Sequence, residues 1–145
     1  MVLFTIGFAG KSAEKFFTSL AKHGVKKLVD IRLNNVTQLA GFTKKNDLKY
    51  FLNVICSIEY EALPQFAPTK ELLAGYRKKA FSWQGYEATY LALLEERQVL
   101  KNLTPENFDK ACLLCSEQKP DFCHRRLAAE YLQRNWEEIM VTHIL

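Results

Sequence analysis

Hydrophobic residues occur along the chain as short continuous runs that alternate with longer amphipathic stretches. The run LFTIGF (3–8) combines apolar, β-branched and aromatic residues with glycine near its end, as is typical of a parallel strand buried on both faces. The stretch 11–24 that follows carries an apolar stripe at helical spacing, with Ser12 placed as an N-cap and Gly24 as a terminator. The chain is therefore predicted to begin with a strand and a helix.

The same alternation continues to the end of the chain. Further strands are predicted at 25–32, 58–63, 110–117 and 138–145, and further helices at 48–56, 70–80, 85–103 and 120–136. Asp47 is expected to cap the first of these helices and Asp121 or Phe122 the last, while 33–46 is expected to form a long loop. Because the connections are too long for hairpins, we predict an α/β fold: a single three-layer domain over 1–145, with a mostly parallel sheet of about five strands flanked by helices.

Length and composition limit the class of protein. A chain of 145 residues with 48% hydrophobic and 25% charged residues is long enough to bury one core and unlike a disordered chain. Its formal net charge of +4 permits an anionic ligand, whereas nucleic-acid-binding domains are usually much more basic. An anionic small molecule or nucleic acid is therefore a possible partner, and the composition does not decide between them.

Two features of the sequence bear on its location. The apolar opening MVLFTIGFAG has no basic flank and is much shorter than the roughly 18 residues that a membrane span needs, so we expect a buried strand, a cytoplasmic protein and no membrane association. The four cysteines are too few and too unevenly spaced for the disulfide framework of a small secreted domain. Reduced thiols are therefore expected.

Chemically active side chains follow the predicted strands at the ends where they leave the sheet. Gly7 ends the first strand, Asp30 and Arg32 end the second, and Cys115 and Glu117 end the fourth. In open parallel sheets, ligands bind in the crevice at the carboxyl ends of the strands. We therefore expect these residues to meet at one edge of the sheet.

The pair Asp30 and Arg32 interrupts an apolar strand with two opposite charges on the same side of the sheet. Burying such charges is costly unless they are paired or used. One hypothesis is that Arg32 holds an anion while Asp30 orients it or transfers a proton. The alternative is an ion pair that only caps the strand.

The segment CLLCSEQKPDFCHRR (112–126) concentrates cysteine, histidine and arginine. A zinc site is not expected, because Cys112 and Cys115 are three residues apart on a predicted strand and so point to opposite faces, and because Cys123 and His124 diverge around a helix. No metal and no cofactor are predicted.

A chemical role for this segment is the second possibility. Cys123, His124 and Arg125 fall in the first turn of the predicted last helix, where free backbone N–H groups attract anions. The helix terminus and a neighbouring imidazolium or guanidinium would lower the pKa of the Cys123 thiol. The third possibility is structural, with the cysteines packed as small hydrophobes and His124 hydrogen-bonded in the interior.

With TIGFAGKSAEKFFTSLAKHGVKKLVDIR near one end and LLCSEQKPDFCHRRLAAEYL near the other, the chain resembles the DUF488 family, small proteins without an established activity. The recurrent features of that family correspond here to Thr5, Ile6 and Gly7, to Asp30 and Arg32 (D-x-R), to Cys115 and Glu117 (C-x-E), and to Cys123, His124 and Arg125 (CHR). The resemblance implies an intracellular α/β domain with a site at these motifs, and it implies no reaction.

The first functional hypothesis is an enzyme that binds a phosphate-bearing or otherwise anionic ligand. Cys123 or Cys115 would be the nucleophile of a hydrolase or transferase, and protons would be moved by the remaining titratable residues. The expected proton-transfer residues are His124, Asp30 and Glu117, and the expected ligand-binding residues are Arg32, Arg125, Gly7, Lys44, Lys45 and Tyr60. Two alternatives stay open: a nucleic-acid-binding module without chemistry, and a redox-sensing or structural protein that uses Cys115 and Cys123.

Overall fold

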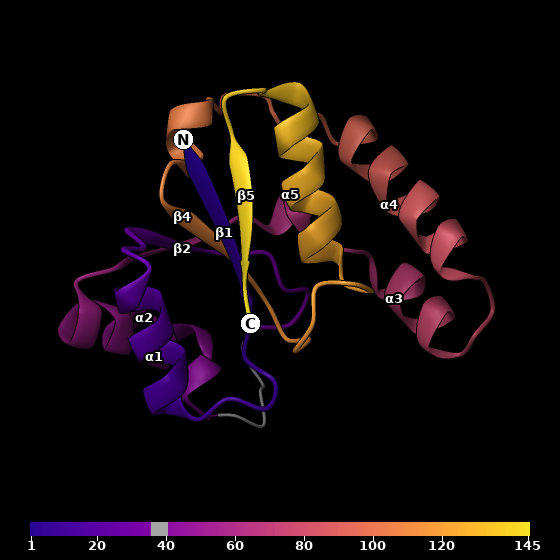
Figure 1. Ribbon diagram of the computed structural model, residues 1–145. Coiled ribbons are helices and arrows are strands. Elements are labelled where there is room, and N and C mark those ends of the chain that lie inside the picture. Colours follow the sequence, from indigo (N-terminus) through magenta and orange to yellow (C-terminus); the bar gives the residue numbers. More distant parts are fainter. Residues whose placement is uncertain (36–40) are drawn as a thin grey trace.

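The computed structural model describes residues 1–35 and 41–145, which fold around a single parallel sheet (Figure 1). In the described residues the sheet has five strands in the order β3-β2-β4-β1-β5, and every pairing is parallel. The strands are β1 (Val2–Gly7), β2 (Lys27–Asp30), β3 (Glu59–Ala62), β4 (Ala111–Cys115) and β5 (Met140–Ile144). The predicted α/β class and its parallel sheet are confirmed.

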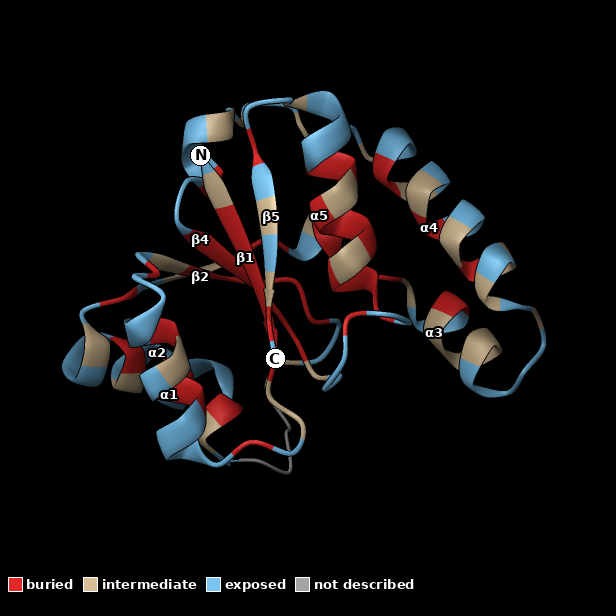
Figure 2. Cartoon of the chain, in the orientation of Figure 1, coloured by how far each residue is buried: buried red, intermediate tan, exposed pale blue. Residues whose placement is uncertain are grey.

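Helices cover both faces of the sheet. The helices are α1 (Ala13–Lys22), α2 (Lys45–Phe51), α3 (Lys70–Arg77), α4 (Trp83–Glu96) and α5 (His124–Asn135). Apolar residues of α1 and α2 pack with one face of the strands, and those of α3, α4 and α5 pack with the other. Figure 2 shows the consequence: buried residues lie on the inner strands and on the sheet-facing sides of the helices.

The first helix begins where the sequence predicts. The Ser12 hydroxyl accepts a hydrogen bond from the backbone N–H of Lys15 at 3.1 Å, and Gly24 follows the helix with a positive φ of 72°. Ser12 therefore satisfies one of the N-terminal backbone donors, and Gly24 allows the left-handed turn after the C-terminal end.

Two other predicted caps are wrong. α2 begins at Lys45 after Lys44, so Asp47 lies inside the helix, and a π-helical turn, Leu52–Cys56, continues it. α5 begins at His124 with Cys123 as its N-cap residue, because the Cys123 N–H bonds to the Pro120 carbonyl and holds the preceding residues in a turn. Asp121 and Phe122 therefore precede the helix.

The predicted loop 33–46 is shorter than expected at its C-terminal end. A 3-10 turn, Gly41–Thr43, precedes α2, and residues 36–40 of the predicted loop lie outside the described residues. The described parts of the chain contain no helix with the length and apolar character that crossing a membrane requires.

Candidate functional site

The strand ends that carry the predicted site lie side by side in the middle of the sheet. In the parallel register, Gly7 of β1 is opposite Cys115 of β4, and Asp30 of β2 is opposite Leu114. The carboxyl ends of β1, β4 and β2 therefore form one edge, and the N-terminal end of α5 packs above them. The predicted convergence of these strand ends is observed.

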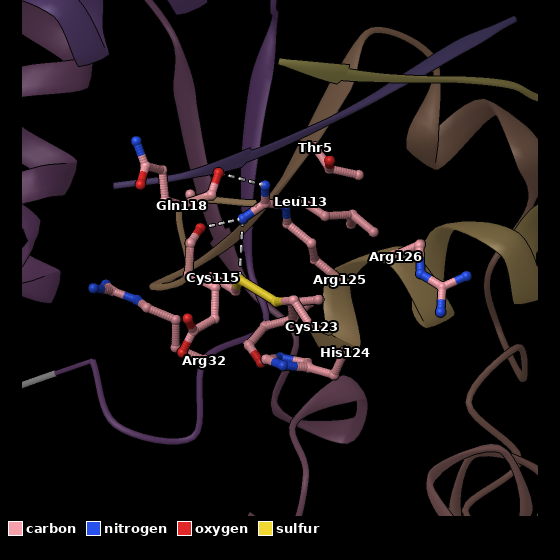
Figure 3. The surroundings of a disulfide bond; sticks show 12 residues. Thr5, Arg32, Leu113, Cys115, Gln118, Cys123, His124, Arg125 and Arg126 are labelled. Carbon is pink, nitrogen blue, oxygen red and sulfur yellow. Dashed lines mark hydrogen bonds between the residues drawn. A yellow bond between two sulfur atoms is a disulfide. The ribbon is translucent and has the colours of Figure 1, made fainter. Parts of the chain in front are cut away.

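A disulfide bond joins Cys115, the last residue of β4, to Cys123, the N-cap residue of α5 (Figure 3). Both residues are buried, with 1% and 3% of their surfaces exposed. The expectation of reduced thiols is wrong for this pair, whereas Cys56 and Cys112 are free. It failed because the overall cysteine count carries no information about two residues that the fold brings together.

Arg125 is fully buried beside the disulfide. Its Nη1 donates to the Cys115 sulfur at 3.3 Å and to the Glu117 carbonyl at 2.5 Å, and its Nη2 donates to the Gln118 carbonyl at 3.2 Å (Figure 3). Burial lowers the pKa of Arg125 to about 10, so the guanidinium is still charged at neutral pH. No carboxylate among the described residues lies within ion-pair distance of it.

Gly7 makes this arrangement possible. A Cβ atom at Gly7 would overlap with the carbonyl of Glu117 and with Nη1 of Arg125. The Gly7 carbonyl also accepts a hydrogen bond of 2.7 Å from Nζ of Lys11, a residue only 9% exposed. Burial, and then the charge of Arg125, lower the pKa of Lys11.

The Asp30–Arg32 pair is a buried ion pair. Nε and Nη2 of Arg32 donate to the two carboxylate oxygens of Asp30, each at 2.8 Å, and the Arg32 backbone N–H donates to the same carboxylate at 3.1 Å. The Tyr60 hydroxyl donates a further hydrogen bond of 2.5 Å, and burial together with this carboxylate raises the pKa of Tyr60. Asp30 is therefore fully engaged, whereas Nη1 of Arg32 is a buried donor without a partner in the described residues.

His124 is a neutral residue of the interior. Its Nε2 lies 2.8 Å from the carbonyl of Ile31, and because a carbonyl only accepts, Nε2 carries the proton. Burial lowers its pKa to about 4, against a usual value of 6.5. The expectation that a neighbouring imidazolium lowers the pKa of Cys123 is therefore wrong at neutral pH, and the guanidinium of Arg125 is the cation at the sulfur pair.

This imidazole makes stability depend on pH. Between pH 6.5 and 4 the unfolded chain binds a proton at His124 that the folded chain does not, so the free energy of unfolding falls as the pH falls. A pKa decrease from 6.5 to about 4 corresponds to about 3 kcal/mol, present in full above pH 6.5 and lost by pH 4. Denaturant titrations at several pH values will measure the slope.

His124→Gln, whose amide can still donate to the Ile31 carbonyl, should flatten this slope. His23→Gln, at an exposed position, is the control and should keep it. An unchanged slope in His124→Gln would assign the pH dependence to other groups.

Four of the sequence-derived candidates have side chains that lie apart from the sulfur pair. The Glu117 side chain is exposed, and its backbone carbonyl rather than its carboxylate contacts Arg125. Lys44 and Lys45 are exposed at the start of α2. Tyr60 lines an open cavity of about 550 Å³ together with residues of α2 and the π-helical turn.

The sequence analysis did not identify Lys11 or Gln118, and it did not foresee that backbone carbonyls would accept hydrogen bonds from Arg125. Lys11 has a visible signal, since it is a cation in the short loop after the first strand. Gln118 contributes a backbone carbonyl, for which no sequence signal exists. Among the described residues, no group of three or more His, Cys, Asp or Glu residues is placed to hold a metal ion.

Comparison with known proteins gives one match. Residues 12–132 match the family described as "Domain of unknown function DUF488". This range includes the D-x-R, C-x-E and CHR motifs and excludes all of β1 and all of β5. No curated protein and no solved structure matches the chain.

Proposed function

The chain belongs to the DUF488 family, whose description names no function, and from the geometry of its site we propose that it is a thiol–disulfide redox protein that cycles Cys115 and Cys123 between dithiol and disulfide. The observation that carries this proposal is the bond between two cysteines from separate elements, β4 and α5. Among the hypotheses that the sequence leaves open, the redox role of Cys115 and Cys123 is the one that this bond supports.

The surroundings of the pair suit a dithiol as well as a disulfide. A thiolate is stabilised by a nearby cation and by a helix N-terminus. Arg125 provides the cation at 3.3 Å from Cys115, and Cys123 is the N-cap residue of α5. Reduction takes up two electrons, breaks the S–S bond and leaves two sulfurs, at least one of which can stay ionised beside the guanidinium.

The other hypotheses stay predictions. Arg32 and Arg125, expected to hold an anion, already donate to Asp30 and to backbone carbonyls. Two buried donors, Nη1 of Arg32 and Nε of Arg125, have no partner in the described part of the chain, and they are the observation in favour of an anion. A nucleic-acid-binding module would be recognised by an affinity that falls steeply with salt.

A redox titration tests the proposal. The protein is equilibrated with mixtures of oxidised and reduced dithiothreitol, then denatured and alkylated. Mass spectrometry locates the cysteines that carry the alkyl group. We expect Cys115 and Cys123 to escape alkylation together in one two-electron transition, while Cys56 and Cys112 are alkylated throughout. Cys115→Ser should abolish the transition and Cys56→Ser should keep it; alkylation of all four thiols under the most oxidising buffer would disprove the proposal.

The bond should also stabilise the fold. It closes a short loop with a sequence separation of 8 residues, for which chain entropy gives about 2 to 3 kcal/mol. We expect the free energy of unfolding of the oxidised protein to exceed that of the reduced protein by this amount in urea. Cys123→Ser should show the same stability with and without reductant.

A further inference from the structure

We propose that Cys115 is the reactive sulfur of the pair and that its substrate is a small, uncharged hydroperoxide. This inference rests on the proposed redox function and specifies the site further. It assigns Cys123 as the thiol that closes the disulfide, and Arg125 as the residue that stabilises the attacking thiolate.

The distribution of charge selects Cys115. Arg125 donates to two neutral carbonyls and to the Cys115 sulfur, so its buried positive charge has no carboxylate partner among the described residues. Lys11, also buried and hydrogen-bonded to the Gly7 carbonyl, adds a second cation near Arg125. A buried cation without a counter-charge is costly, and a thiolate at Cys115 supplies that charge.

A thiolate would be less stabilised at Cys123 or at Cys112 than at Cys115. Cys123 is the N-cap residue of α5, but within the described part of the chain its side chain makes no hydrogen bond to the helix terminus, and the guanidinium of Arg125 donates to Cys115 instead. Cys112 is on the opposite face of the sheet, packed with apolar residues of α1 and β2, and burial raises the pKa of its thiol. A difference in reactivity between Cys115 and both of these is therefore expected.

Burial limits the size and charge of the oxidant. With 1% and 3% of their surfaces exposed, Cys115 and Cys123 are out of reach for the disulfide of another folded protein. A neutral molecule of two or a few heavy atoms pays the smallest desolvation cost on entering such a site. A hydroperoxide meets both conditions, and the Cys115 sulfur that would attack it lies 3.3 Å from Nη1 of Arg125.

The reaction balances with these groups. The Cys115 thiolate attacks the terminal oxygen of ROOH, the S–O bond forms, the O–O bond breaks, and RO⁻ leaves and takes a proton from solvent to give ROH. The Cys123 thiol then attacks the sulfenic acid at Cys115, forming the S–S bond and releasing water. The peroxide is reduced by two electrons and the dithiol is oxidised by two; a low-molecular-weight dithiol such as dithiothreitol restores the starting state.

Trapping of the intermediate tests the assignment. Reduced Cys123→Ser is treated with hydrogen peroxide and dimedone, and the adduct is located by mass spectrometry. We expect the adduct at Cys115, and none at Cys123 in Cys115→Ser at the same peroxide dose. An adduct at Cys123 but not at Cys115 would overturn the inference and leave the redox pair intact, since the dithiothreitol titration of the unaltered chain is independent of it.

Rate measurements test Arg125 and the substrate class. Arg125→Gln should lower the second-order rate constant of peroxide with Cys115 about tenfold or more, and Arg125→Lys should restore part of it. Arg126→Lys is the control: its side chain is partly exposed on α5, and the rate constant should stay within about twofold. For each oxidant, the rate constant with the protein is divided by the rate constant of the same oxidant with free cysteine. This ratio should be far lower for oxidised glutathione than for hydrogen peroxide. Equal relative rates for the two oxidants, or an unchanged constant in a folded Arg125→Gln, would overturn the inference; where Arg125→Gln does not fold, the adduct positions decide.

Discussion

Replacing Gly7 by alanine is expected to lower the free energy of unfolding by about 4 kcal/mol. The new Cβ would overlap with the Glu117 carbonyl, which is backbone and cannot rotate away, and with Nη1 of Arg125. Relief requires the loop after β4 to move, which breaks the hydrogen bonds of a buried charged donor. Urea denaturation of the reduced protein measures the loss without a contribution from the disulfide.

Gly41→Ala is the matched control. Apart from its chain neighbours, no heavy atom of the described residues lies within 4 Å of a Cβ at Gly41, which starts a 3-10 turn. We expect its stability to change by no more than about 0.5 kcal/mol. Equal denaturation midpoints for Gly7→Ala and Gly41→Ala would show that the close approach of Arg125 to β1 is not needed for the fold.

The fold class could be predicted from the sequence because β4 and α1 have residue patterns that suit both their local secondary structure and their packing in the core. β4 is buried at all five positions and has a continuous apolar sequence, which is the pattern of a central parallel strand. α1 has an apolar stripe that packs on the sheet and a serine that caps it. Errors fall at the first residues of α2 and α5, where backbone turns rather than side-chain caps decide the first residue, and at the end of α4, which stops at Glu96 although a helix was predicted to residue 103.

The candidate site was predicted as a set of residues but not as a set of contacts. The parallel direction of the strands follows from the α/β pattern, and it places Gly7, Asp30 and Cys115 at the same edge of the sheet. The strand order and the register that make them neighbours come from the structure. The partners of Arg125 are backbone carbonyls of Glu117 and Gln118, which any residue type offers. The sequence therefore identifies Arg125 as a hydrogen-bond donor, but the carbonyl groups that accept from it are known only from the fold.

Burial separates the three motifs into different roles. The D-x-R motif forms an internally matched ion pair, with Tyr60 completing the shell of Asp30. In C-x-E the sulfur of Cys115 and the backbone of Glu117 face Arg125. In CHR the three residues provide the second sulfur, a neutral imidazole held by the Ile31 carbonyl, and the cation. Redox chemistry is thus proposed for two motifs, while the third stabilises the strand edge beside them.

The D-x-R pair is the source of the second large effect. The side chains of Asp30 and Arg32 are 0% and 3% exposed, so both charges are removed from water and compensate each other. Removing one partner of such a pair leaves the other buried and uncompensated, which costs about 3 to 5 kcal/mol. The Arg126–Glu130 pair of α5 has the same chemistry but side chains that are 26% and 42% exposed, and pairs of that kind contribute about 0.5 kcal/mol.

Asp30→Asn is therefore expected to lower the free energy of unfolding by about 3 to 5 kcal/mol at pH 7, and Glu130→Gln by about 0.5 kcal/mol or less. The amide keeps the size of the carboxylate, so the loss reports charge rather than volume. Chemical denaturation of both variants, with the cysteines reduced, measures the difference. The double variant Asp30→Asn/Arg32→Met should recover part of the loss, because no unpaired charge is then left at the strand end. A loss in Asp30→Asn no greater than that in Glu130→Gln would mean that Arg32 does not depend on Asp30 and is compensated in the variant by another group, such as an anion from solution.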